Sequence, residues 1–127
     1  MADNKTILIA EDSSVILNLT KKILELQKYR ILTAKNGGEV LKQVENNKID
    51  AILMDLNIPV KNGMDCTKEI RSHENKEIAS IPIIAVTGNA NNYSMEDFKE
   101  AGINDYLPKP LDFDALVLTV KKHTEAA

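Results

Sequence analysis

The chain has 127 residues and a formal net charge of -3, and 43% of its residues are hydrophobic. This size favours one compact domain, residues 1–127, and the acidic balance gives no basic field for direct binding to nucleic acid. No apolar run approaches the roughly 20 residues that span a membrane, and Cys66 is the single cysteine, so we expect a cytoplasmic protein without a disulfide.

Short apolar runs alternate with segments of helical periodicity in the first half of the chain. We expect a strand over residues 5–10, a helix from Ser13 or Ser14 to about residue 27, and a weaker strand over residues 29–34. A second helix then follows Asn36, and the third strand covers residues 49–54. In the first helix the residues predicted to face inward are Ile16, Leu19, Ile23 and Leu26 or Gln27.

The second half continues the same alternation. The pattern predicts a third helix from about Met64 to His73, a polar loop over residues 74–80, and a fourth strand that opens at Ile81. A helix over residues 91–101 ends at Gly102, and a strand over 103–107 precedes a last helix over 111–123. Alternating strands and helices favour a parallel sheet between two layers of helices, which is a doubly wound α/β fold.

Polar residues stand directly after the predicted strands. They are Glu11 and Asp12 after the first, Asp55 after the third, Thr87 after the fourth and Lys109 after the fifth. The carboxyl ends of parallel strands share one edge of the sheet, where open α/β folds place their chemistry. Crowded carboxylates favour a bound cation, and Mg²⁺ prefers oxygen ligands together with phosphate oxygens. A phosphoryl group on Asp55 would add a charge of about -2, which Mg²⁺, Lys109 and the Thr87 hydroxyl would offset.

These motifs resemble the receiver domain of two-component response regulators over residues 7–120. The resemblance is closest in style to receivers of hybrid histidine kinases and to stand-alone single-domain receivers. It implies a flavodoxin-like (βα)5 fold with strand order 2-1-3-4-5, and transfer of a phosphoryl group from a histidine kinase or histidine phosphotransfer protein. The matching segments are Ala10-Glu11-Asp12-Ser13, Met54-Asp55-Leu56-Asn57-Ile58-Pro59, Asn62-Gly63, Ala85-Val86-Thr87 and Asn104-Asp105-Tyr106-Leu107-Pro108-Lys109-Pro110.

The resemblance also implies a role for each residue of the site. Asp55 would be the phosphoacceptor, with Thr87 and Lys109 binding the phosphoryl group. Mg²⁺, or Mn²⁺ as a substitute, would be bound by Glu11, Asp12, Asp55 and the backbone carbonyl of Asn57. Thr87 and Tyr106 would form a switch that changes the surface of the fourth helix, fifth strand and last helix, and the bond before Pro110 would be cis.

The resemblance further implies phosphorylation and dephosphorylation of the domain's own Asp55 instead of turnover of a separate substrate. We expect a monomer or a weak dimer that depends on phosphorylation, with neither nucleic acid nor membrane as a direct partner. Leu17 lies about 100° from the expected inward stripe, on the helix against which the family's phosphotransfer partners dock. Leu17 is therefore a candidate docking residue, although single exposed apolar side chains are normal.

Other functions are compatible with parts of the pattern. A metal-dependent nuclease or topoisomerase-type domain also has acidic residues after its first and third strands, but it leaves Thr87 and Lys109 unexplained. A flavodoxin-like flavin carrier has the same architecture, but Glu11 and Asp12 would repel its phosphate. A degenerate receiver that acts only as a protein-binding module is the third alternative, and the intact Asp55 argues against it.

Overall fold

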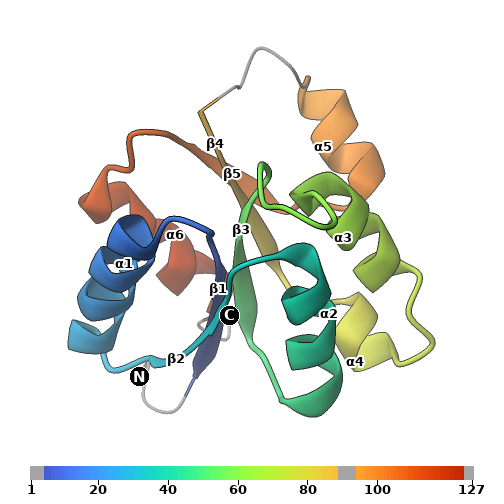
Figure 1. Cartoon of the computed structure of the whole chain (residues 1–127), viewed down its shortest axis with the longest axis horizontal. Helices are drawn as coiled ribbons and strands as arrows, with labels where there is room; N and C mark the ends of the chain where they lie inside the picture. The colour runs from blue at the N-terminus through green and yellow to red at the C-terminus, as the bar shows by residue number, and fades with distance from the viewer. Residues whose placement is uncertain (1–4, 89–93, 125–127) are drawn as a thin grey trace.

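A parallel sheet of five strands forms the centre of the molecule in the computed structural model, which describes residues 5–88 and 94–124. The strands follow the order β2-β1-β3-β4-β5 (Figure 1). The predicted doubly wound α/β fold and its strand order are confirmed. The strand bounds are Thr6–Ala10 (β1), Arg30–Ala34 (β2), Ala51–Asp55 (β3), Ile83–Thr87 (β4) and Asp105–Pro108 (β5).

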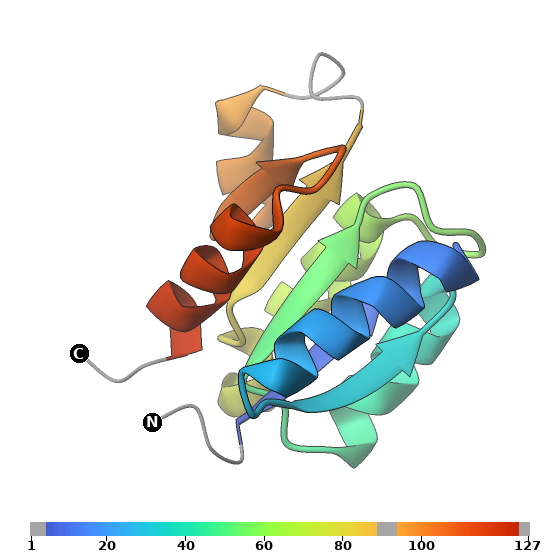
Figure 2. The same cartoon turned by 90° about the vertical axis from the view of Figure 1, so that its left-hand side faces the viewer.

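Helices cover both faces of this sheet. Figure 2 shows α1 and α6 on the face turned toward the viewer, and α2, α3 and α5 lie on the other face (Figure 1). The helix bounds are Ser14–Leu26 (α1), Gly37–Asn46 (α2), Gly63–Arg71 (α3), Lys76–Ala79 (α4), Met95–Ala101 (α5) and Phe113–Thr124 (α6). Residues 91–93 of the predicted fourth helix lie outside the described residues.

Residues of each inner strand alternate between two hydrophobic clusters, one on each face of the sheet. In β4, Ile83 and Ala85 belong to the cluster that includes residues of α2, α3 and α5. Ile84 and Val86 belong to the cluster that includes residues of α1 and α6. Because both faces are covered by helices, the strands are hydrophobic at almost every position.

The predicted orientation of α1 is wrong by about one residue. The buried residues of this helix are Leu17, Thr20 and Leu24, whereas Leu19 is 46% exposed. The helix has apolar residues on several sides, so its hydrophobic pattern is compatible with more than one rotation about its axis. Thr20 is accommodated in the interior because its hydroxyl donates a hydrogen bond of 2.8 Å to the Ile16 carbonyl.

Leu17 is therefore not the exposed docking residue that the sequence predicted. Its side chain is only 4% exposed and packs in the cluster beneath α1 and α6. A partner that contacts α1 meets instead the exposed residues Val15, Ile16 and Leu19.

A short helix, α4, occupies part of the segment predicted as a polar loop. The Asn75 side chain accepts a hydrogen bond of 2.9 Å from the Glu77 N–H and thereby caps this helix. With only four residues, α4 lies below the length at which hydrophobic periodicity is detectable.

Arg71, the last residue of α3, connects α3 with α4 and α5. Its guanidinium donates hydrogen bonds to the Gly102 carbonyl (2.9 Å), the Ala79 carbonyl (2.8 Å) and the Asn104 side-chain oxygen (2.8 Å). A Cβ on Gly102 would lie 2.6 Å from Arg71 Cγ, so glycine is required both for this contact and for its φ of 94°. Burial lowers the pKa of Arg71, and the three acceptors compensate for part of the lost hydration.

Replacing Arg71 with alanine should lower the free energy of unfolding by about 2 kcal/mol, because two partly buried carbonyls lose a charged donor. Arg71→Lys should recover only part of this loss, because a single ammonium does not reach three separate acceptors. Urea unfolding of both variants measures the effect. Equal stability of wild type and Arg71→Ala would show that solvent replaces these hydrogen bonds without loss.

Candidate functional site

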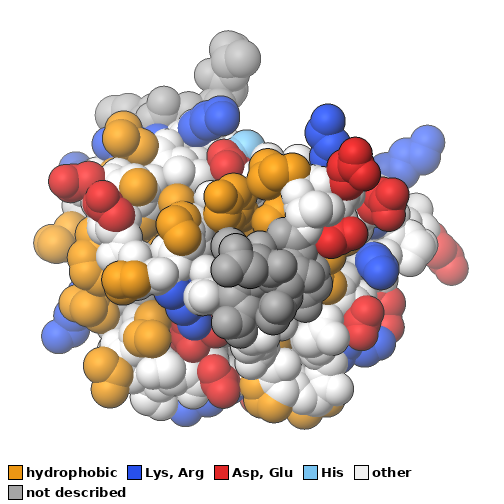
Figure 3. Space-filling model, turned by 90° about the horizontal axis from the view of Figure 1, so that it is seen from above, with side chains coloured by type: hydrophobic (Ala, Val, Ile, Leu, Met, Phe, Trp, Pro, Cys, Tyr) orange, Lys and Arg blue, Asp and Glu red, His pale blue; other side chains and the backbone are white. Residues whose placement is uncertain are grey.

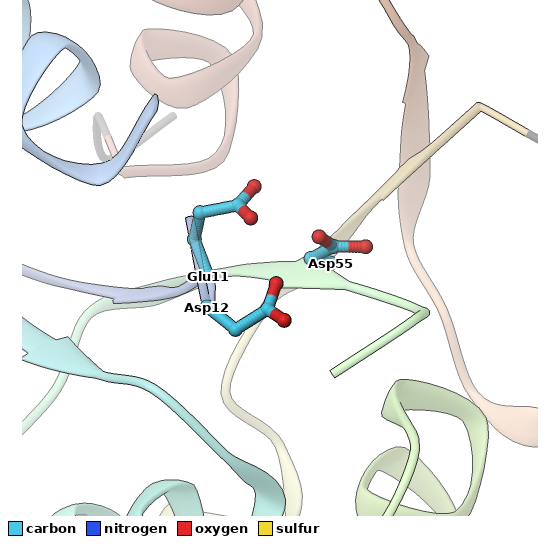
Figure 4. Close-up of side chains that lie close together, drawn as sticks. All are labelled: Glu11, Asp12 and Asp55. Carbon is cyan, nitrogen blue, oxygen red and sulfur yellow. The ribbon is translucent and has the colours of Figure 1, made fainter. Parts of the chain in front are cut away.

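Charged side chains from three strand ends meet at the upper edge of the sheet. Glu11 and Asp12 follow β1, and Asp55 is the last residue of β3, which lies next to β1. Lys109 directly follows β5. Figure 4 shows the three carboxylates side by side, between the start of α1 and the loop that leaves β3. The structure thus brings together the charged residues that the sequence analysis selected.

The carboxylates of Glu11, Asp12 and Asp55 each offer an oxygen atom, and these three atoms all lie within 4.8 Å of one another. Glu11 and Asp55 are only 4% and 3% exposed, whereas Asp12 is exposed. Two backbone N–H groups orient the buried pair: that of Ser13 donates to Glu11 Oε2 (3.1 Å), and that of Asn57 donates to Asp55 Oδ1 (2.9 Å). A compact, partly open set of carboxylate oxygens fits Mg²⁺, which takes oxygen ligands and retains several waters.

Burial raises the pKa of Glu11, and the neighbouring charge of Asp55 raises it further. The folded protein therefore keeps a proton on Glu11 to higher pH than the unfolded chain does. The resulting stabilisation is present at low pH and is lost as the pH rises through the raised pKa. Above that pKa, the metal-free site contains closely spaced negative charges, and a divalent cation relieves their repulsion.

Lys109 supplies the positive charge of the site. Its Nζ lies 2.9 Å from Asp55 Oδ2 and 3.5 Å from Glu11 Oε1. Burial alone would lower the pKa of Lys109, but the hydrogen bond to Asp55 and the two negative charges raise it. Lys109 is thus an ammonium at neutral pH. The peptide bond between Lys109 and Pro110 is cis, as the resemblance implied.

Thr87 is the last residue of β4, which lies next to β3, and Tyr106 lies on β5, on the other side of β4. Thr87 is 1% exposed and pairs in register with Pro108 of β5. Tyr106 is half-buried, and its ring centroid lies 5.5 Å from that of Phe98 on α5. The sequence analysis did not single out Phe98, since one aromatic residue on a helix gives no signal of the residue it contacts.

The two histidines lie outside the acidic cluster, and each pairs with another carboxylate. His123 Nε2 is 3.1 Å from Asp105 Oδ2, and His73 Nε2 is 2.8 Å from Glu45 Oε1. The pair of His123 and Asp105 connects α6 to the start of β5, where Asp105 directly precedes Tyr106.

The family model for the response regulator receiver domain matches residues 7–121. The chain belongs to this family. Among curated proteins, the receiver domain is 37% identical over 113 residues to the CAI-1 autoinducer sensor kinase/phosphatase CqsS of Vibrio cholerae, covering 89% of this chain and 16% of that protein. It is 29% identical to the polar-differentiation response regulator DivK of Brucella anthropi, covering 94% of this chain and 95% of DivK.

Solved structures of receiver domains agree with this assignment. The receiver domain of the sensor histidine kinase PA1611 from Pseudomonas aeruginosa, which has a magnesium ion in its active-site cleft, gives a TM-score of 0.86 at 34% identity and covers 97% of this chain and 99% of that one. The receiver domain of Ssk1, in complex with the histidine phosphotransfer protein Ypd1 of Saccharomyces cerevisiae, gives a TM-score of 0.88 at 26% identity. This match covers 98% of this chain and 91% of the Ssk1 receiver chain.

We predict that Mg²⁺ stabilises the wild-type domain and that Asp12→Asn removes most of this effect. A ligand at 100 times its dissociation constant raises the free energy of unfolding by about 2.7 kcal/mol. Without metal, the variant should be at least as stable as the wild type, because one of three neighbouring negative charges is removed.

Urea unfolding with and without Mg²⁺ measures both effects. Glu100→Gln, which removes an exposed charge from α5, is the control and should keep the full response. An undiminished response in Asp12→Asn would contradict a site at this cluster.

Proposed function

We propose that this receiver domain accepts a phosphoryl group on Asp55 from a phosphohistidine of a histidine kinase or histidine phosphotransfer protein, in a reaction that requires Mg²⁺. The main support is the buried Asp55 carboxylate, which is paired with Lys109 and adjoins two further carboxylates. We also infer a cytoplasmic domain that is a monomer or, when phosphorylated, a weak dimer. Within residues 5–88 and 94–124, no helix is long and apolar enough to cross a membrane.

The chemistry is an in-line displacement. An Asp55 oxygen attacks phosphorus, the P–O bond forms, and the P–N bond to the partner's imidazole breaks. The released imidazole takes a proton from solvent. Lys109, already 2.9 Å from Asp55 Oδ2, offsets negative charge that develops on the phosphoryl oxygens. Hydrolysis by water at the phosphorus would return Asp55 to its carboxylate.

Glu11, Asp12, Asp55 and the Asn57 carbonyl would hold Mg²⁺, or Mn²⁺ in its place. When bound, the metal supplies positive charge beside the transferred group. The long side chain of Glu11 is already oriented by the Ser13 N–H, so its carboxylate is fixed in the cluster before any ligand arrives.

Thr87 and Tyr106 would report the new charge to the surface of α5, β5 and α6, which correspond to the predicted fourth helix, fifth strand and last helix. Thr87 would bind the phosphoryl group through its hydroxyl. Tyr106 would turn toward the space that Thr87 leaves, and its contact with Phe98 connects it directly to α5. The size of the change is limited by the difference in interaction energy between the two states.

An apolar groove beside the phosphoacceptor supports docking of the donor. It has a volume of about 570 Å³ and lies between the start of α1 and the segment that joins β5 to α6. Figure 3 views the molecule from above and shows hydrophobic side chains gathered on the side of α1 and α6. Lys109 lines the groove and its Nζ lies 2.9 Å from Asp55 Oδ2, so a partner seated there would place its phosphohistidine near Asp55. The lining residues are Val15, Ile16, Leu19, Lys109, Pro110, Leu111 and Phe113.

Incubation with Mg²⁺ and a small phosphodonor such as phosphoramidate should add one acid-stable, base-labile phosphoryl group, and Asp55→Asn should abolish it. Lys109→Gln should slow the labelling by about 100-fold, because the developing charge loses its fixed cation. Intact-mass spectrometry over time measures both. Absence of an adduct with every donor would favour the alternative of a receiver that acts only as a protein-binding module.

Leu19→Glu should slow transfer from a phosphohistidine protein by about tenfold, because it places a charge in an apolar contact. Leu26→Glu is the matched control: Leu26 is 80% exposed at the far end of the same helix, and this variant should transfer at the wild-type rate. Radiolabel transfer between purified proteins gives the rates. An equal rate in Leu19→Glu would exclude this groove as the docking surface.

A further inference from the structure

A second pocket opens at the amino edge of the sheet, at the opposite end of the strands from the acidic cluster. Because the strands are parallel, all of them begin at this edge (Figure 2). The pocket has a volume of about 490 Å³, which is the size of a small-molecule site. Its lining residues stand at the beginning of β1 and β2 and in the turn between α2 and β3. The proposed phosphoryl transfer does not use this pocket.

Backbone hydrogen bonds hold the strands around the pocket together. The Arg30 N–H donates to the Lys5 carbonyl at 2.8 Å, and the Asp50 N–H donates to the Thr6 carbonyl at 2.8 Å. The segments that lead into β2 and β3 are therefore fixed on the two sides of β1. The position of the strand residues that line the pocket is thus set by the sheet itself.

The turn after α2 is fixed against β2 by side chains. The Asn47 side-chain nitrogen donates to Gln43 Oε1 at 2.8 Å, and the Gln43 side-chain nitrogen donates to the Thr33 carbonyl at 3.1 Å. Asn47 lines the pocket, so this wall is connected to β2 through two consecutive hydrogen bonds. A pocket whose walls are already in place loses less entropy when a ligand binds.

The pocket carries an excess of positive charge. Lys5, Arg30 and Lys48 line it, together with a single carboxylate, that of Asp50. Asp50 Oδ2 accepts a hydrogen bond of 2.8 Å from the Thr6 N–H. Within residues 5–88 and 94–124, none of the three cationic side chains forms an ion pair. One exposed lysine needs no explanation, but three unpaired cations around one cavity repel one another in a chain whose net charge is -3.

The lining also indicates the chemistry of a ligand. A guanidinium such as that of Arg30 binds a phosphate through two parallel N–H groups, and lysine ammonium groups add charge. Three cations suit a group with more than one negative charge, so a phosphate fits better than a single carboxylate. Ile31 and Leu32 are half-buried and supply apolar surface in the same pocket. A phosphorylated molecule with an organic part therefore matches the lining better than a free inorganic ion.

We infer that this pocket binds a nucleoside diphosphate, with its phosphates at Lys5, Arg30 and Lys48 and its organic part against Ile31 and Leu32. The site lies at the other edge of the sheet from Asp55, and the inference does not depend on the proposed function.

Calorimetric titration with ADP, GDP, CDP and UDP tests this site. EDTA is present throughout, so that no metal connects the phosphates to the acidic cluster. We expect saturable binding of at least one nucleotide, and Arg30→Gln should weaken it about tenfold or more because the guanidinium is lost. Lys22→Gln removes an exposed cation from α1 and should leave the affinity unchanged. Both variants should retain the wild-type urea midpoint, because both side chains are exposed.

Inorganic pyrophosphate and amide NMR spectra test the two parts of the assignment. Pyrophosphate lacks the organic part and should bind about tenfold more weakly than the best nucleotide. On titration with that nucleotide, the amide resonances of Thr6 and Asp50 should shift, whereas those of Asp12 and Asn57 should not.

Three results would overturn the inference. They are the absence of saturable binding by all four nucleotides at millimolar concentration, an equal loss of affinity in Arg30→Gln and Lys22→Gln, and resonance shifts confined to Asp12 and Asn57. Equal affinities for pyrophosphate and for the best nucleotide would overturn the role of Ile31 and Leu32. Each of these results would leave the proposed transfer to Asp55 intact.

Discussion

The imbalance of charge at the sheet edge is the constraint on which the rest of this receiver domain depends. Three carboxylates, those of Glu11, Asp12 and Asp55, adjoin the ammonium of Lys109, which leaves a formal excess of two negative charges when all four groups are ionised. Two of these carboxylates are almost fully buried. Buried charge is tolerated only when it is paired, so the site favours a divalent cation and resists further negative charge without one.

Backbone packing places these groups with little freedom. Gly63, the first residue of α3, lies against the end of β3: a Cβ there would be 2.8 Å from the Asp55 carbonyl oxygen. Its N–H donates to the Leu56 carbonyl at 3.1 Å, and the Asn62 side chain caps the helix. The Asn62-Gly63 pair therefore fixes the backbone of Asp55, and this gives a physical reason for that motif. On the other side, the Lys109 N–H donates to the Thr87 carbonyl at 3.0 Å, so the ammonium enters the site from a strand end that is itself fixed.

The sheet and the charged edge can be predicted from sequence because both follow from local patterns. A buried parallel strand requires an unbroken apolar run, and the polar residue that ends each run marks the sheet edge, as at Asp55 and Thr87. The rotation of α1 does not follow in this way, because Ile16 and Leu17 are equally apolar and only packing against the sheet decides which is buried. The contacts of Arg71 are likewise set by distant segments. A basic residue in the last turn of a helix gives no signal of them.

The same contacts define which part of α5 is free to respond in the proposed switch. The carboxyl end of α5 is fixed, because Arg71 donates to the Gly102 carbonyl and to Asn104, and the Asn104 side chain also accepts the Ile83 N–H at 2.8 Å. The middle of the helix contacts the switch residue through Phe98 and Tyr106. In the proposed switch, a change in Tyr106 would act on α5 at a distance from its fixed end, and the helix would tilt about Gly102 more readily than shift as a whole. The surface altered most would be the amino-terminal end of α5, where Met95 is 63% exposed.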